Sequence, residues 1–232
     1  MADSTVAFNA SSNEDDQYGL LPVDQDLHQP QETEGISPAA EYTISETLFS
    51  PEFTLAWDEQ IGEWHKAAEE GDPEKQVLLA MCFYFGDGVP KDVDEAVRWF
   101  LKAAEQDYAE AQCRLGLCYD VGAGVSQNKK EAVEWFRKAA EQGHAEAQCR
   151  LGLCYDVGAG VSQNKREAVK WYHKAAEQGH ADALHLLGGC YYYGWGVPKD
   201  EEEATKWLRR AAEEHGLESA IILLQRIRNH SG

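Results

Sequence analysis

Apolar residues recur with a helical period in two successive segments, and this pair of segments then repeats along the chain. Ala111, Leu115 and Tyr119 follow one another at intervals of four residues, which places them on one face of a helix. Ala132 and Trp135 begin a second amphipathic series after a glycine-containing break. The pattern predicts pairs of amphipathic helices joined by short turns.

The repeat has a period of 36 residues. Residues 109–129 read AEAQCRLGLCYDVGAGVSQNK, and residues 145–165 have the same sequence. One helix pair cannot bury both of its apolar faces, so neighbouring pairs must stack. We therefore expect an all-α protein, a right-handed α/α superhelical solenoid of helix–turn–helix repeats. Its four repeats are predicted at residues 72–107, 108–143, 144–179 and 180–215.

Glycine residues mark the expected turns and close contacts. The Gly122-Ala-Gly124-Val segment supplies the positive φ angles that a reversal needs, and Gly143 is placed to end a second helix. Gly116 and Gly152 are expected where the two helices of a pair approach closely. The last copy of this position is Leu224, which no second helix follows.

Helices are also expected at both ends of the repeats. Ser50 as N-cap and Pro51 at the first helical position predict an N-terminal capping helix at 50–71. A lone helix is predicted in a C-terminal cap at 216–232. Residues 1–49 hold ten acidic residues and neither Lys nor Arg, a composition that predicts a disordered acidic tail. The tail could solubilise the chain, direct export or fold on a partner.

Charge and hydropathy narrow the class of protein. The net charge is −20, and no basic stretch could neutralise a phosphate backbone, so we expect no nucleic-acid partner. No apolar run reaches 18 residues, so we expect no membrane insertion. The first residues lack a secretory signal, which favours a cytoplasmic location, with a secreted effector acting in a host cell as the alternative.

Six cysteines are candidates for metal, redox or disulfide chemistry. Cys82, Cys118, Cys154 and Cys190 recur every 36 residues on the core face, where cysteine acts as a small apolar residue. Cys113 and Cys118 point to different sides of one helix and cannot bridge. No Cys-x2-Cys motif or cluster of histidines occurs, so we expect free thiols, no metal and no cofactor.

The recurring positions follow the pattern A-x3-LG-x2-Y-x2-G-x-GV-x6-A-x2-W-x3-AA-x2-G. This pattern resembles the Sel-like repeat family, which is related to tetratricopeptide repeats, over roughly residues 60–230. The resemblance implies a scaffold or adaptor that holds a partner protein or peptide in a concave groove lined by the first helices. Cysteine-rich relatives join helix pairs through cysteines seven residues apart, a spacing that is absent here.

No catalytic constellation accompanies the repeats. The Gly-x-Gly segments recur at a fixed period and are expected to be turns rather than phosphate-binding loops. His144 and His180 occupy equivalent positions between repeats and are expected to be polar turn residues. We therefore predict that the chain is not an enzyme. An enzyme of the cysteine-rich type, whose relatives are linked to β-lactam binding, is a third alternative that lacks a nucleophile motif.

A candidate binding surface follows from helical geometry. At 100° per residue, one face of each first helix lies roughly opposite the core face. The predicted partner-binding residues on it are Val77, Met81, Tyr84, Phe85, Glu110, Leu117, Asp120, Val121, Glu146, Leu153, Asp156, Val157, Asp182, His185, Tyr192 and Tyr193. The same face contains Glu74, Cys113, Cys149 and Gly189. Alternatively, Leu117 and Val121 pack against the next first helix.

The residues of this face also predict the chemistry of the partner. Apolar anchors next to carboxylates favour a protein or peptide with apolar and basic side chains, bound by a monomer. The acidity of the chain also allows a dedicated inhibitor or immunity protein that caps a basic toxin or enzyme. The sequence leaves both possibilities open.

Overall fold

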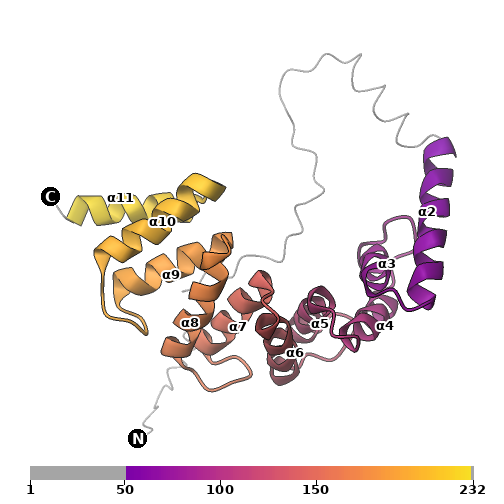
Figure 1. Cartoon of the computed structure of the whole chain (residues 1–232), viewed down its shortest axis with the longest axis horizontal. Helices are drawn as coiled ribbons and strands as arrows, with labels where there is room; N and C mark the ends of the chain where they lie inside the picture. The colour runs from indigo at the N-terminus through magenta and orange to yellow at the C-terminus, as the bar shows by residue number, and fades with distance from the viewer. Residues whose placement is uncertain (1–50, 231–232) are drawn as a thin grey trace, which may run out of the picture. The chain divides into compact units, whose positions relative to one another are not determined.

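The computed structural model describes residues 51–230 of the 232. The predicted acidic tail and its neighbour Ser50 lie outside the described residues. Within that range the chain forms ten helices and no strand (Figure 1): α2 (Pro51–Glu69), α3 (Pro73–Phe85), α4 (Val93–Ala104), α5 (Ala109–Val121), α6 (Lys129–Glu141), α7 (Ala145–Val157), α8 (Lys165–Glu177), α9 (Ala181–Tyr193), α10 (Glu201–His215) and α11 (Glu218–His230). None of the helices in this part is long and apolar enough to cross a bilayer.

The helices pack as successive pairs. Helices α3 and α4, α5 and α6, α7 and α8, and α9 and α10 form the four pairs. Each second helix also contacts the first helix of the next pair, so the pairs stack in chain order (Figure 1). Helix α2 packs on α3 at one end, and α11 packs on α10 at the other. The predicted all-α solenoid is confirmed.

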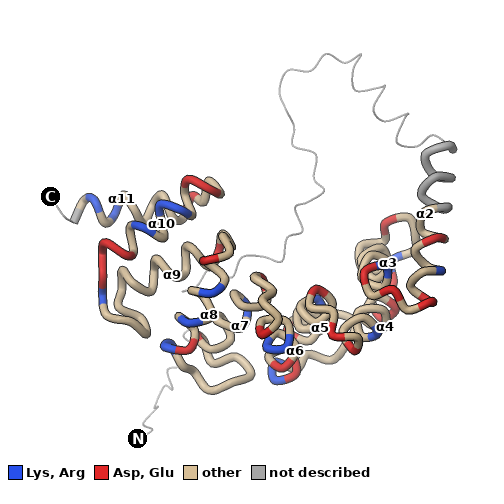
Figure 2. Tube along the Cα trace, in the orientation of Figure 1, with Lys and Arg blue, Asp and Glu red and all other residues tan. Residues whose placement is uncertain are grey.

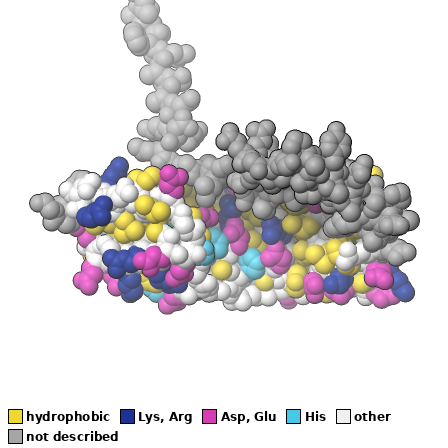
Figure 3. All heavy atoms as spheres, turned by 90° about the horizontal axis from the view of Figure 1, so that it is seen from above, with side chains coloured by type: hydrophobic (Ala, Val, Ile, Leu, Met, Phe, Trp, Pro, Cys, Tyr) yellow, Lys and Arg dark blue, Asp and Glu magenta, His cyan; other side chains and the backbone are white. Residues whose placement is uncertain are grey.

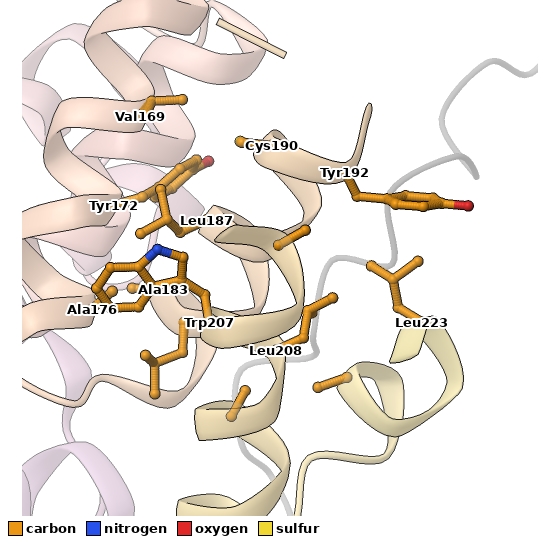
Figure 4. Close-up of a cluster of buried hydrophobic side chains, with 14 of the residues drawn as sticks. Val169, Tyr172, Ala176, Ala183, Leu187, Cys190, Tyr192, Trp207, Leu208 and Leu223 are labelled. Carbon is orange, nitrogen blue, oxygen red and sulfur yellow. The ribbon is translucent and has the colours of Figure 1, made fainter. Parts of the chain in front are cut away.

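The core repeats with the sequence. Leu79, Leu115, Leu151 and Leu187 are fully buried in the four first helices. The presumed close contact at Gly116 is confirmed, because a Cβ there would lie 2.7 Å from the ring of Phe136 on the second helix. Figure 4 shows the same packing further along, where Tyr172, Leu187 and Leu208 come from α8, α9 and α10.

Buried glutamines tie the first two turns between repeats to the helices around them. Nε2 of Gln112 donates to the carbonyl of Ala104 at 3.3 Å, and its Oε1 accepts from Nε2 of Gln142 at 2.8 Å. Gln148 makes the same two bonds with Ala140 and Gln178. Each bridge spans the end of one repeat and the start of the next, and the buried amide groups are thereby satisfied.

The glycine loops lie against the preceding repeat. Gly124 and Gly160 have φ angles of 65° and 72°, so each turn uses the left-handed region that glycine favours. A Cβ at Gly160 would also collide with the backbone carbonyl of Lys129, at the start of α6. Glycine is required at position 160 for two reasons, the positive φ angle of the turn and the close approach of the Lys129 backbone.

Candidate binding surface

Every first helix ends in an exposed apolar residue that is followed by glycine. Gly122, for example, caps α5 in the left-handed conformation, and its N–H donates to the carbonyl of Cys118. The residue before each capping glycine is about half exposed. These residues are Phe85 (53%), Val121 (49%), Val157 (54%) and Tyr193 (43%), and we call them the apolar row.

The apolar row comprises most of the exposed large apolar side chains in the described part of the chain. Only Ile221 and Ile222 of α11 are otherwise exposed among the large hydrophobic residues described. Figure 3 shows that hydrophobic side chains reach the surface in two groups on the face seen from above, with histidine side chains between them. A pattern that recurs in four repeats is part of the surface design rather than scattered exposure.

Some predicted surface residues are buried instead. Val77, Asp156 and Tyr192 are each less than one-tenth exposed, so their side chains do not present a surface to a partner. Cys113 and Cys149, on the same predicted face, are almost fully buried. The cause is the next repeat: Cys113 of α5 belongs to the core cluster built by α6 and α7.

Leucine at the centre of the face is shared between the surface and the core. Leu117 is partly buried against the cluster of α6 and α7, and Leu153 against the cluster of the following repeat. Leu117 is thus partly covered by a cluster that includes residues of the next unit, whereas Val121 stays exposed. The other predicted residues are partly exposed: Met81, Tyr84, Glu110, Asp120, Glu146, Asp182 and His185.

Aromatic residues stand at both ends of the apolar row. The rings of Tyr84 and Phe85 meet edge to face, with centroids 5.1 Å apart. At the other end, Tyr193 stacks on Trp195 at 4.5 Å, and Tyr192 lies near Leu223 of α11 (Figure 4). Sequence reasoning missed Trp195, although it replaces the small or acidic residue found between the glycines of the other loops.

The central carboxylates are held by neighbouring cations. Oε1 of Glu110 accepts from Nε of Arg114 at 2.7 Å, and Oε2 lies 2.8 Å from Nε2 of His144. Glu146 has the same partners one repeat later, Arg150 at 2.6 Å and His180 at 2.7 Å. The spacing of Glu and Arg by four residues was the available signal for the arginines.

Two of the three aspartates of the face are paired as well. Oδ1 of Asp120 lies 2.8 Å from Nζ of Lys129, and Oδ1 of Asp156 lies 2.7 Å from Nζ of Lys165. Each pair joins the end of a first helix to the start of its second helix. A basic partner would therefore compete with cations that the chain itself supplies.

The expected histidine turn residues have a further role. Nδ1 of His144 accepts from the backbone N–H of Ala147 at 3.2 Å and so caps α7, while the opposite ring nitrogen faces Glu110. His180 caps α9 in the same way. These contacts are structural, and no group of three or more potential metal ligands occurs among the described residues.

A comparison with protein-family models matches the Sel1 repeat at residues 76–108, 109–144, 145–180 and 181–215. The chain belongs to the Sel1 repeat family. Proteins of this family generally serve as non-enzymatic scaffolds, and binding to other proteins is typical of them. No curated protein matches the chain in sequence.

Solved structures with Sel1 repeats resemble this chain. A Sel1 repeat protein from Oxalobacter formigenes is 36% identical, with a TM-score of 0.67, and the match covers 72% of this chain and 48% of that one. The protective antigen c5321 of uropathogenic Escherichia coli, which displays an SLR fold, is 32% identical, with a TM-score of 0.70 and coverage of 82% and 40%. The chain thus spans less than half the length of either protein.

A third structure shares the fold alone. The immunity protein Pa5087 from Pseudomonas aeruginosa is 24% identical, with a TM-score of 0.50 and coverage of 82% of this chain and 69% of that one. At this identity the likeness concerns the arrangement of helices.

Proposed function

We propose that this Sel1 repeat chain is a non-enzymatic scaffold that binds a partner protein or peptide along its first helices. The supporting observation is the apolar row, which leaves Phe85, Val121, Val157 and Tyr193 about half exposed in four successive repeats. Apolar side chains exposed at a constant interval offer anchor points for an extended or helical segment.

Charge has a secondary role in this proposal. The carboxylates beside the apolar row are already paired with Arg114, Arg150, Lys129 and Lys165. Partly exposed ion pairs contribute little net energy, and a partner cation must displace an existing one. Apolar contacts therefore supply most of the affinity, and the paired charges orient the partner.

The proposal is tested with the double substitution of Val121→Ser and Val157→Ser. Tagged parent and variant chains are crosslinked in an extract of the native cells, and the captured proteins are quantified by mass spectrometry. The captured amount of each protein that binds this surface should be at least about tenfold lower for the variant, because two anchor side chains are lost. Unchanged capture by the variant would place the contact elsewhere.

A matched control uses the second helices. Glu105 and Glu141 are exposed at or near the ends of α4 and α6. Their conversion to Gln changes two surface residues without touching the apolar row. This control variant should capture the same proteins as the parent, and both variants should keep the circular dichroism spectrum of the parent.

A second candidate is a dedicated inhibitor or immunity protein, which the net charge of −20 favours. Such a protein would yield one tight partner whose binding weakens steeply with salt, because association would depend on unlike net charges. The scaffold proposal expects several partners with modest salt dependence. Capture at 50 and 500 mM salt separates the two.

A further inference from the structure

Gly189 lies within α9 at a position where the other repeats carry a large apolar side chain. The equivalent residues are Met81, Leu117 and Leu153. A Cβ on Gly189 would meet no atom within 4 Å, whereas a Cβ on its neighbour Gly188 would lie 2.6 Å from Leu208. Glycine is unfavourable inside a helix, and packing does not require it at this position. Gly189, which is itself buried, therefore leaves open the space beside its backbone that a Cβ occupies in the other repeats.

Two residues on the same side of α9 flank this space. His185 precedes Gly189 by one helical turn and Tyr193 follows it by one turn, so all three lie on one face. Nδ1 of His185 is buried and makes no hydrogen bond within the described part of the chain. Burial lowers the pKa of His185, which keeps its ring neutral at pH 7. Four other buried side-chain atoms of the described residues also lack a partner, and atoms of this kind are commonly satisfied by water or by a ligand group.

Position 185 is as unusual as position 189. The other three repeats carry Val77, Cys113 and Cys149 there, all buried and apolar or nearly so. The fourth repeat thus departs from its neighbours at two consecutive turns of one helix face. The combined departure removes an apolar side chain and adds a hydrogen-bonding group.

The rim beside Tyr193 combines aromatic rings with cations. Nη1 of Arg226 donates to the Tyr193 hydroxyl at 3.2 Å, and Nζ of Lys199 lies 5.4 Å from the centre of the Tyr192 ring. Helix α11 carries two arginines and one acid, as the blue segments of Figure 2 show. Lys199 is also paired with Glu201 at 2.8 Å, so the arginines of α11 are the cations that favour a carboxylate at this end of the surface.

We propose that the space over Gly189 is the anchor site of the binding surface, and that it takes a large apolar side chain, preferably aromatic, next to a carboxylate of the partner. The inference rests on the proposed scaffold function and names its main contact. An indole fits the requirements best, because its rings can stack beside Tyr193 while its N–H is a donor that His185 lacks.

The test is an NMR titration of the ¹⁵N-labelled full chain with indole-3-propionate. We expect saturable shifts at the amides of Gly189 and Tyr193, with a dissociation constant of about 1 mM for a ligand of this size. Tryptamine carries the opposite charge and should bind at least about threefold more weakly. Propionate alone should give no saturable shift at these residues.

Gly189→Leu should abolish these shifts by filling the space with the side chain of the other repeats. Its melting temperature should equal or exceed that of the parent, since leucine is the better helix former. Gly189→Ala provides a smaller filling and should weaken binding about threefold. Glu141→Gln, on the second helix α6 and outside the apolar row, should leave the titration unchanged.

Absence of a saturable shift, or the same shifts in Gly189→Leu, would overturn the anchor site. The proposed scaffold function has its own outcome. If the Val121 and Val157 double variant loses the protein partner while Gly189→Leu retains it, the proposed binding surface stands and the proposed anchor site over Gly189 is wrong. If neither variant affects capture, the surface itself is wrong.

Discussion

Nε2 of His144 lies 2.8 Å from Oε2 of Glu110, and the two residues belong to neighbouring repeats. The same contact joins His180 to Glu146 at 2.7 Å. Because the histidine also caps the helix that it begins, one imidazole links two first helices. The relative placement of successive repeats at the binding surface therefore depends on an ionisable pair.

This linkage predicts a loss of stability in acid. The hydrogen bond from His144 lowers the pKa of Glu110 to about 2, with further lowering by Arg114, against an ordinary value of 4.5. His180 and Arg150 do the same for Glu146. The carboxylates of Glu110 and Glu146 bind protons more readily in the unfolded chain than in the folded chain. Their stabilisation of the fold is therefore complete above pH 4.5 and disappears as the pH falls toward 2.

Urea unfolding between pH 7 and 3 measures this effect. The free energy of unfolding of the parent should fall below pH 4.5. In the double variant of Glu110→Gln and Glu146→Gln the fall should be shallower, because two of the responsible groups no longer titrate. Parallel curves for parent and variant would show that other carboxylates account for the acid response.

Glycines of α5 and α9 should respond in opposite ways to alanine. Gly116→Ala brings a Cβ to 2.7 Å from Phe136 and should destabilise the chain by about 1–3 kcal/mol through overpacking. Gly189→Ala meets no atom within 4 Å and should stabilise it by up to about 1 kcal/mol through helix propensity. Thermal unfolding of the two variants compares them directly. A stabilising Gly116→Ala would contradict the packing described for α5, and a destabilising Gly189→Ala would contradict the open position in α9.

The glutamine bridges predict a cost for Gln112→Leu. The variant introduces an apolar side chain of similar size. It removes one of two donors to the carbonyl of Ala104, the other being the N–H of Asp107, and it removes the acceptor of Gln142, which together costs about 1–2 kcal/mol. The fourth repeat already has Leu184 at this position, and there Nη1 of Arg210 donates to the equivalent carbonyl of Ala176 at 3.3 Å. Unfolding in urea should therefore show a loss for Gln112→Leu. An unchanged midpoint would mean that water replaces the glutamine.

The sequence predicted what repeats locally and missed what depends on the neighbouring repeat. Leu115 and Gly116 follow from helical period and residue size within one pair. The contact of His144 with Glu110 spans 34 residues, and no local pattern announces it. Helical geometry predicts Cys113 on the outer face because it applies to an isolated helix, whereas the next repeat covers that side. The same geometry misplaces Tyr192.

The six buried cysteines predict slow thiol chemistry in the folded chain. All six are free and buried, which agrees with the expected core location of Cys82, Cys118, Cys154 and Cys190. Burial raises the pKa of Cys118 to about 11 and that of Cys154 and Cys190 to about 12, against an ordinary value of 9.0. A pKa of about 11 in place of 9.0, as for Cys118, leaves about a hundredfold less of the reactive thiolate at pH 8.

Reaction with Ellman's reagent at pH 8 checks this expectation. The folded chain, freshly prepared without reductant, should react at least about a hundredfold more slowly than the chain in 6 M guanidinium chloride, where six thiols should titrate. Cys113 and Cys149 should be the last to react, because they are covered by the following repeat and burial raises the pKa of both. Rapid modification of either thiol in the folded chain would show that successive repeats separate readily, which the contacts between repeats oppose.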